Sequence, residues 1–181
     1  MPEYKRVRIF GDPVLREKAR PVESFDEALR ELVSRMFSIM SGAGGIGLAA
    51  PQAGYPLRVI TIDISPAIEE DDARVPGPFV VVNPVITWAS EETEPFEEGC
   101  LSLPGVSVEI VRPSRVTVEY QDEHGRRHVL EADGLLARVL QHEIDHLDGV
   151  LIIDRAEKSE RLRALEEFNQ FLLAEGIESA S

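Results

Sequence analysis

The sequence HEIDH at residues 142–146 has the form H-E-x-x-H. It lies within GLLARVLQHEIDHLDG at 134–149, where apolar residues recur at helical intervals. On a helix, residues four apart share one face, so His142 and His146 could bind one divalent metal ion together. Glu143 could then act on a nearby water molecule as a general base without itself being a ligand. The sequence therefore predicts a metal-binding helix.

A catalytic metal site usually takes three protein ligands and leaves one position open, so two histidines do not complete it. The obvious third ligand is Cys100, the single cysteine of the chain, which lies among turn residues in EGCLS at 98–102. A lone cysteine is more often a buried packing residue, but pairing it with the helix motif reverses that preference. A single cysteine also forms no disulfide within the chain, which fits a reducing compartment.

Other interpretations of the motif must be weighed against this one. The two histidines could simply pair with carboxylates on a solvated helix face. A zinc peptidase would take a third ligand downstream, where no histidine follows but Glu157 and Glu160 are available. A purely structural metal site would need four protein ligands and no open position. His124 and His128 share the same spacing, but turn residues between them predict exposed positions instead.

The rest of the chain predicts an α+β fold with mainly antiparallel sheets around the central metal-binding helix. A helix is expected from Ser24, where Ser24 and Glu27 have capping-box spacing, and it should end near Gly42 and Gly44. A charged, amphipathic C-terminal helix is expected over about 157–174. Segments rich in β-branched residues predict strands at 57–63, 78–86, 106–112 and 115–121, the last opening a hairpin that runs to 131.

Length and charge set the wider expectations. The 181 residues suit one catalytic domain, with a core at 1–154 and the C-terminal helix at 155–181. The segment between Ile64 and Pro78, with its acidic run at 69–72 and three prolines, predicts a solvated loop. A formal charge of −14 repels phosphate backbones, so we expect no direct DNA binding. No apolar run of about 18 residues and no signal-peptide layout occur, so we expect a soluble, intracellular protein without membrane contact.

The glycine-rich sequence GAGGIG at 42–47 formally fits the dinucleotide pattern G-x-G-x-x-G. A helix-like segment precedes it and Pro51 soon follows, so the strand-turn-helix context of that pattern is missing. No Gly-Lys-Ser/Thr follows either, which excludes a phosphate-binding loop. The glycines could let the backbone approach an extended peptide closely, or could form a mobile connector.

Three motifs in order resemble the peptide deformylase family: GIGLAAPQ at 45–52, EGCLS at 98–102 and QHEIDHLDG at 141–149. The resemblance extends from GDPVLR at 11–16 to about Asp154 and leaves only the C-terminal helix outside. It implies hydrolysis of the formyl group from the formyl-methionine of nascent polypeptides, with release of formate. It also implies one divalent metal ion, commonly Fe2+, although Zn2+, Ni2+ or Co2+ can occupy such sites; spacing cannot choose among them.

The same resemblance implies a role for each matching residue. The metal ligands are Cys100, His142 and His146; Glu143 is the general acid and base; Gln52 and the Leu101 backbone N–H stabilise the oxyanion; Ile46, Gly47 and Gly99 pair with the substrate backbone; Phe96, Leu135 and Val139 line the methionine pocket. Arg138 lies near that pocket with no role assigned. The C-terminal helix could pack on the body or contact the ribosome, and the host compartment could be a bacterial cytoplasm or an organelle.

Overall fold

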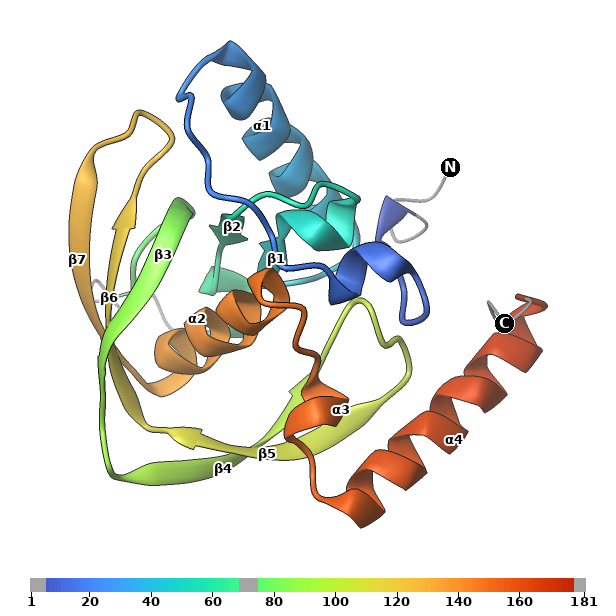
Figure 1. Cartoon of the computed structure of the whole chain (residues 1–181). Coiled ribbons are helices and arrows are strands. Elements are labelled where there is room, and N and C mark those ends of the chain that lie inside the picture. Colours follow the sequence, from blue (N-terminus) through green and yellow to red (C-terminus); the bar gives the residue numbers. More distant parts are fainter. Residues whose placement is uncertain (1–5, 69–74, 178–181) are drawn as a thin grey trace.

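The structure is a computed structural model that describes residues 6–68 and 75–177. Figure 1 shows a curved arrangement of strands with helices inside and around it. The elements in chain order are η2 (Pro13–Arg16), α1 (Glu27–Gly42), β1 (Gly47–Ala49), η3 (Ala50–Ala53), β2 (Val59–Ile62), η4 (Ser65–Ala67), β3 (Phe79–Ala89), β4 (Thr93–Gly99), β5 (Ser107–Pro113), β6 (Arg115–Gln121), β7 (Arg127–Asp133), α2 (Gly134–Leu147), α3 (Ile152–Arg155) and α4 (Lys158–Glu175).

All strand pairs within the two sheets are antiparallel. The larger sheet has the order β1-β2-β3-β6-β7, and β4 and β5 form a second, two-stranded sheet. Pairing of Arg115 with Asp133 at the base of the β6–β7 hairpin confirms the predicted hairpin. The predicted α+β class is also confirmed, and the acidic run at 69–72 lies outside the described residues.

Helix α2 lies in the concavity formed by the strands, which makes it the centre of the fold (Figure 1). Its apolar residues Ala137, Leu140 and Ile144 join a buried cluster with Ile60 and Val81 of the large sheet. Every residue from 137 to 147 except Asp145 is buried, including five polar or charged ones: Arg138, Gln141, His142, Glu143 and His146. Burying a polar side chain costs free energy unless it has hydrogen-bond or ionic partners. The concentration of buried polar residues on α2 therefore indicates a functional role for this helix.

Helix α1 begins later than predicted. Its N-cap is Asp26, whose side chain accepts a hydrogen bond from the Leu29 N–H at 3.1 Å, and the helix proper starts at Glu27. The predicted capping box of Ser24 and Glu27 was therefore wrong, because the Asp26 carboxylate satisfies the free backbone donor instead. The helix ends at Gly42 as expected, and a helix rather than a strand precedes the glycines, which confirms rejection of the dinucleotide pattern.

Besides the 3-10 helices η2, η3 and η4, three elements were not predicted: β1, β4 and α3. Strand β4 has the sequence TEPFEEG, whose proline and acidic residues disfavour a strand locally, yet seven residues pair with β5. Strand β1 and helix α3 are only three and four residues long, too short for a periodic pattern to show.

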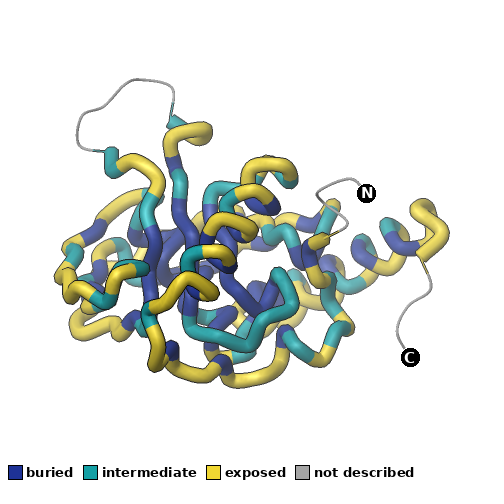
Figure 2. Tube along the Cα trace, turned by 90° about the horizontal axis from the view of Figure 1, so that it is seen from above, coloured by how far each residue is buried: buried dark blue, intermediate teal, exposed yellow. Residues whose placement is uncertain are grey.

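Helix α4 packs on the body through Ala164, Phe168 and Leu172, which are buried in a cluster with residues of β5 and α3. Figure 2 shows buried turns of this helix alternating with exposed ones. The rings of Phe10 and Phe168 pack edge to face, with their centroids 5.8 Å apart. Over residues 6–68 and 75–177, no helix has the length and apolar content of a membrane span.

Candidate metal centre

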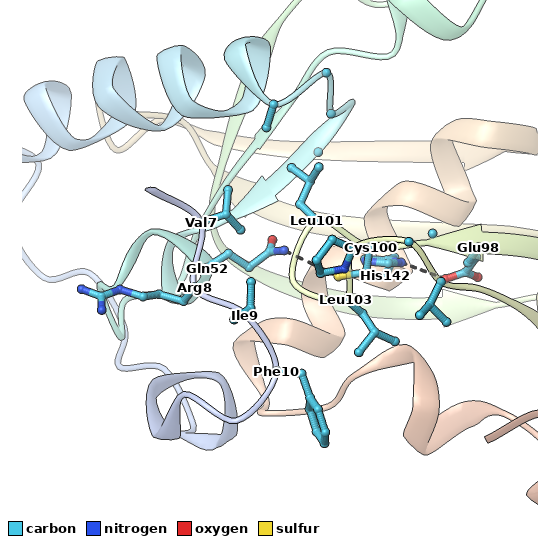
Figure 3. A pocket seen from close by; sticks show the side chains of 18 of the residues that line it. Val7, Arg8, Ile9, Phe10, Gln52, Glu98, Cys100, Leu101, Leu103 and His142 are labelled. Carbon is cyan, nitrogen blue, oxygen red and sulfur yellow. Dashed lines mark hydrogen bonds and ion pairs between the residues drawn. The ribbon is translucent and has the colours of Figure 1, made fainter. Parts of the chain in front are cut away.

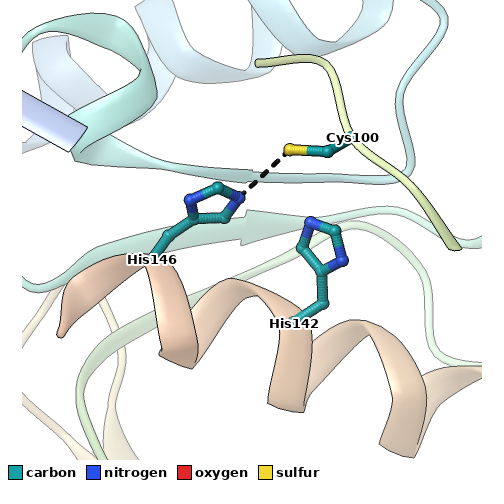
Figure 4. A group of neighbouring side chains, drawn as sticks. All are labelled: Cys100, His142 and His146. Atoms are coloured by element: carbon teal, nitrogen blue, oxygen red, sulfur yellow. Dashed lines mark hydrogen bonds between the residues drawn. The ribbon is translucent and has the colours of Figure 1, made fainter. Parts of the chain in front are cut away.

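Three potential ligands converge where the end of β4 approaches the middle of α2. The Sγ atom of Cys100 lies 3.3 Å from Nε2 of His146, and one ligand atom from each of Cys100, His142 and His146 lies within 4.8 Å of the others (Figure 4). Ligands about 2.0–2.3 Å from one tetrahedral ion lie about 3–4 Å apart, so small side-chain rotations bring all three into range. The donor set of one thiol and two imidazoles suits a borderline-soft divalent metal.

The orientation of His142 is fixed from behind by Glu98. The Nδ1 atom of His142 lies 2.8 Å from Oε1 of Glu98, which leaves Nε2 for a metal. Glu98 also accepts hydrogen bonds from Arg112 at 2.7 and 3.0 Å. Burial opposes ionisation of this carboxyl, but the hydrogen bonds from His142 and Arg112 lower its pKa to about 2. A carboxylate that holds a ligand histidine in this way is a common support for metal sites.

Burial and hydrogen bonds together set the protonation of the other groups on α2. Burial lowers the pKa of His146 well below its usual value, so this imidazole is neutral and its nitrogen lone pair can bind a metal. For His142, burial acts in the same direction, but hydrogen bonds to Cys100 and Glu98 raise its pKa well above the usual value, so a metal bound at Nε2 would displace a proton. Burial raises the pKa of Glu143 to about 7, against the opposing charge of His142.

Glu143 has the surroundings that a proton-transfer group needs. It is 4% exposed, and its Oε2 atom is buried without a hydrogen-bond partner among the described residues. A carboxyl group with a pKa near neutrality and a free oxygen can both accept and return a proton. Glu143 and His142 also line the same cavity.

Gln52 is held beside Cys100 by a short 3-10 helix, η3. It is 1% exposed, and its Oε1 accepts a hydrogen bond from the Ala49 N–H at 2.9 Å. Its Nε2 donates to Ser102 Oγ at 3.1 Å and lies 3.7 Å from Cys100 Sγ (Figure 3). The amide donor is therefore fixed next to the sulfur, and Leu101 directly follows that sulfur in the chain.

One cavity of about 1300 Å³ collects the predicted site residues. They are Ile46, Gly47, Gln52, Phe96, Gly99, Cys100, Leu101, Leu135, Val139, His142 and Glu143. His146 is the predicted site residue outside this lining, because it lies beneath the others at 1% exposure. A Cβ atom on Gly47 would lie 3.0 Å from Glu143 Oε1, so the close approach of β1 to α2 requires glycine here.

Sequence reasoning missed the roles of Glu98 and Arg112. Both are charged yet at most 5% exposed, and Arg112 also donates to Asp145 Oδ2 at 2.8 Å. The sequence held one indication of the role of Glu98, which lies two residues before Cys100. Arg112 gave none, because its partner comes from a neighbouring strand.

Fold and site together define a class of protein: a hydrolase whose H-E-x-x-H helix and neighbouring thiol can hold a metal ion beneath an open cavity. The family model described as polypeptide deformylase matches residues 4–162. A peptide deformylase of Thermotoga neapolitana is 50% identical over 157 residues, covering 87% of this chain and 90% of that protein. A peptide deformylase of Treponema pallidum (strain Nichols) is 46% identical over 162 residues, covering 90% of this chain and 94% of that protein.

Solved structures agree. The peptide deformylase of Legionella pneumophila superposes with a TM-score of 0.85 at 40% identity, covering 95% of this chain and 97% of that one. The peptide deformylase of Thermus thermophilus superposes with a TM-score of 0.80 at 45% identity, covering 93% of this chain and 98% of that one. The chain belongs to the polypeptide deformylase family. It is a hydrolase that removes the N-formyl group of nascent peptides, as the three motifs predicted.

Proposed function

We propose that Cys100, His142 and His146 bind one divalent metal ion, Fe2+ in the cell, with Zn2+, Ni2+ or Co2+ able to replace it. The neutral His146 ring and the Glu98 contact behind His142 support this assignment. When bound, such an ion acts as a Lewis acid toward the formyl carbonyl and lowers the pKa of water at the site.

Glu143 is the general base and then the general acid. Its carboxylate takes a proton from the attacking water and later gives it to the amine of the departing peptide. The Gln52 amide and the Leu101 backbone N–H stabilise the negative charge that develops on the formyl oxygen. The anchored geometry of Gln52 supports this role, because a donor fixed in advance needs no reorganisation during the reaction.

The substrate is the formyl-methionyl end of a nascent polypeptide, bound in extended form. Strand β1 is the edge of the large sheet, and among the described residues β4 pairs only with β5, so each has an unpaired edge at the cavity. Backbone groups of Ile46, Gly47 and Gly99 are placed to add the peptide as a further strand. The apolar side chains of the cavity receive methionine: Phe96, Leu135 and Val139.

The convergence of Cys100, His142 and His146 beside Glu143 is the observation that carries this function. Its test is anaerobic purification, elemental analysis and measurement of formate release from a formyl-methionyl peptide. Glu143→Ala should keep the fold and the metal but lose about 10²–10⁴-fold in kcat. Cys100→Ser should lose metal and activity. Full activity in either variant would reject the assigned role.

The zinc-peptidase alternative is less well supported. Glu160, one of its two candidate ligands, is engaged by Arg163 at 2.7 Å. The cluster of potential metal ligands found among the described residues instead contains Cys100 together with His142 and His146. If Cys100→Ser retained metal while Glu157→Ala or Glu160→Ala lost it, the alternative would be correct.

Nascent chains occur where proteins are made, so we place the protein in the cytoplasm, with a ribosome contact through α4. The inner face of α4 packs on the body, but Leu162 and Leu173 are 60% and 81% exposed and available to a partner. Cosedimentation with ribosomes should weaken in a Leu162→Glu, Leu173→Glu variant. Unchanged cosedimentation would reject the contact. The charge of −14 supports the absence of direct DNA binding.

A further inference from the structure

Arg138 is a buried cation in the wall of the cavity, four residues before His142 on α2, and is only 8% exposed. Its Nη1 atom donates to Glu98 Oε2 and to the Ile110 carbonyl, each at 3.0 Å. Its Nη2 atom donates to the Glu94 carbonyl at 2.7 Å. One side chain therefore joins the central helix to both strands of the β4–β5 sheet.

The guanidinium of Arg138 also lies over the ring of Phe96, 5.5 Å from its centroid. Phe96 is 49% exposed, so packing alone leaves much of its ring unsupported. On β4, Phe96 lies between Glu94 and Glu98, and Arg138 contacts all three residues. A cation–π contact combined with hydrogen bonds on either side holds both the ring and its strand in place.

Charge balance does not require Arg138. Glu98 receives two hydrogen bonds from Arg112, at 2.7 and 3.0 Å, and remains paired without Arg138. The contact of Glu98 with His142 uses Oε1, whereas Arg138 contacts Oε2. Loss of Arg138 therefore leaves the support of His142 in place and removes the link between α2 and Phe96.

We propose that Arg138 is a positioning residue that sets specificity for the first side chain of the substrate, because it fixes Phe96 and β4 as one wall of the receiving pocket. The inference rests on the proposed function in its assignment of Phe96 to that pocket. Since Arg138 acts on the wall and not on the reacting atoms, its loss changes KM and side-chain preference more than kcat.

The test compares wild type, Arg138→Met, Arg138→Lys, Phe96→Ala and the double variant Arg138→Met, Phe96→Ala. Substrates are formyl-Met-Ala and formyl-Leu-Ala peptides. Arg138→Met should raise KM for the methionine peptide about 10-fold and leave kcat within about threefold of the wild-type value. The ratio of kcat/KM for the methionine peptide to kcat/KM for the leucine peptide should fall. Arg138→Lys, which keeps the charge and can reach part of the acceptor set, should be intermediate. The double variant should be no worse than Phe96→Ala, because both changes act on one wall.

Arg30→Met is the matched control: it removes a partly exposed arginine that pairs with Glu27 on α1, outside the cavity lining, and KM should not change. Thermal midpoint and metal content are measured for every variant. If Arg138→Met does not fold, Arg138→Lys carries the same comparison.

An unchanged KM and preference in the Arg138 variants, beside an altered Phe96→Ala, would overturn the inference alone. Losses that add to those of Phe96→Ala, with lower kcat and metal content, would also overturn it, because Arg138 would then act through Glu98 and His142. If Phe96→Ala itself behaves as wild type, the pocket assignment of the proposed function fails, and the inference with it.

Discussion

Gly47 lies where β1 passes close to α2, and a side chain there would meet Glu143, the proposed proton-transfer group. An added Cβ would be 2.9 Å from Val139 Cγ1 and 3.0 Å from Glu143 Oε1. We therefore expect Gly47→Ala to displace Glu143 and lower kcat for formyl-Met-Ala about 100-fold, since small misplacements of catalytic groups have effects of this size. The measurement is steady-state kinetics, with the fold checked by circular dichroism.

The control for this prediction is Gly77→Ala. An added Cβ at Gly77 meets nothing within 4 Å, and the residue lies outside the cavity lining. Kinetics of the control should match wild type. If Gly47→Ala also matched wild type, the short distance to Glu143 would have no catalytic consequence.

At the residue scale, the sequence was most informative where the proposed metal ligands repeat along one element. The spacing of His142 and His146 fixes their common face on a helix, so their convergence follows from local geometry. Glu98 and Arg112 are brought together by the pairing of β4 with β5, which no local sequence pattern predicted. The same holds for Arg138, whose acceptors on β4 and β5 are 28 to 44 residues away.

Helix ends give the next prediction, because two glycines share a conformation but differ in surroundings. Gly149, after α2, has φ +73°, and Gly176, after α4, has φ +66°. A Cβ on Gly149 would lie 2.6 Å from the Arg16 carbonyl oxygen, whereas one on Gly176 meets nothing within 4 Å. Gly176→Ala should cost about 1 kcal/mol for the left-handed conformation. Gly149→Ala should cost about 2–4 kcal/mol, because backbone must also move.

Urea unfolding of both variants checks this difference. Equal losses of unfolding free energy would show that the conformation alone matters and that the Arg16 segment yields freely. A larger loss at Gly149 would confirm that the turn after α2 is packed directly against Arg16, at the end of η2.

The same segment is tied to α3 by an ion pair that gives a pH dependence. Arg16 contacts Asp154 at 2.5 Å, and Asp154 also accepts from the Leu151 N–H at 2.8 Å. Burial opposes ionisation of Asp154, but its hydrogen bonds with Arg16 and Leu151 lower its pKa below 3.8. Its stabilising effect is therefore complete above the unfolded pKa near 3.8 and is lost as the pH falls through the lower folded value.

Asp154→Asn keeps an acceptor for Leu151 and removes the charge. Because the pair is partly exposed, the variant should lose only about 0.5–1 kcal/mol of unfolding free energy at pH 7. As the pH falls through the lower folded pKa of Asp154, the variant should approach wild type. Urea unfolding at pH 7 and along an acid series makes the measurement, and a difference that persists unchanged at low pH would contradict the ion-pair explanation.

At the element scale, prediction succeeded where a pattern was long enough to repeat. Strand β6 runs over the predicted residues, and α4 differs by one residue at each end. Strand β4 was missed because its pairing with β5, and not its own composition, makes it a strand. The start of α1 depended on which of two acceptors caps the helix, a choice that spacing alone could not make.

Across the whole molecule, α4 is the element whose relation to the catalytic body is least determined by the sequence motifs. The predicted division into a core at 1–154 and a helix at 155–181 stays a prediction. The contacts favour one cooperative unit, because Phe168 is 2% exposed and packs with Phe10 from the other end of the chain. Phe171 and Leu172 of the same helix also line the cavity.

Phe168→Ala tests this unity. Truncating a buried phenylalanine removes apolar burial and leaves a cavity, so the variant should lose about 3–5 kcal/mol of unfolding free energy in one cooperative transition. Leu173→Ala is the matched control on the same helix; at 81% exposure it should change stability by less than about 0.5 kcal/mol. Urea unfolding followed by circular dichroism and by activity should give coincident curves for Phe168→Ala. If activity instead survived while helix signal was lost early, α4 would unfold separately, and the body would be an independent unit that merely carries it.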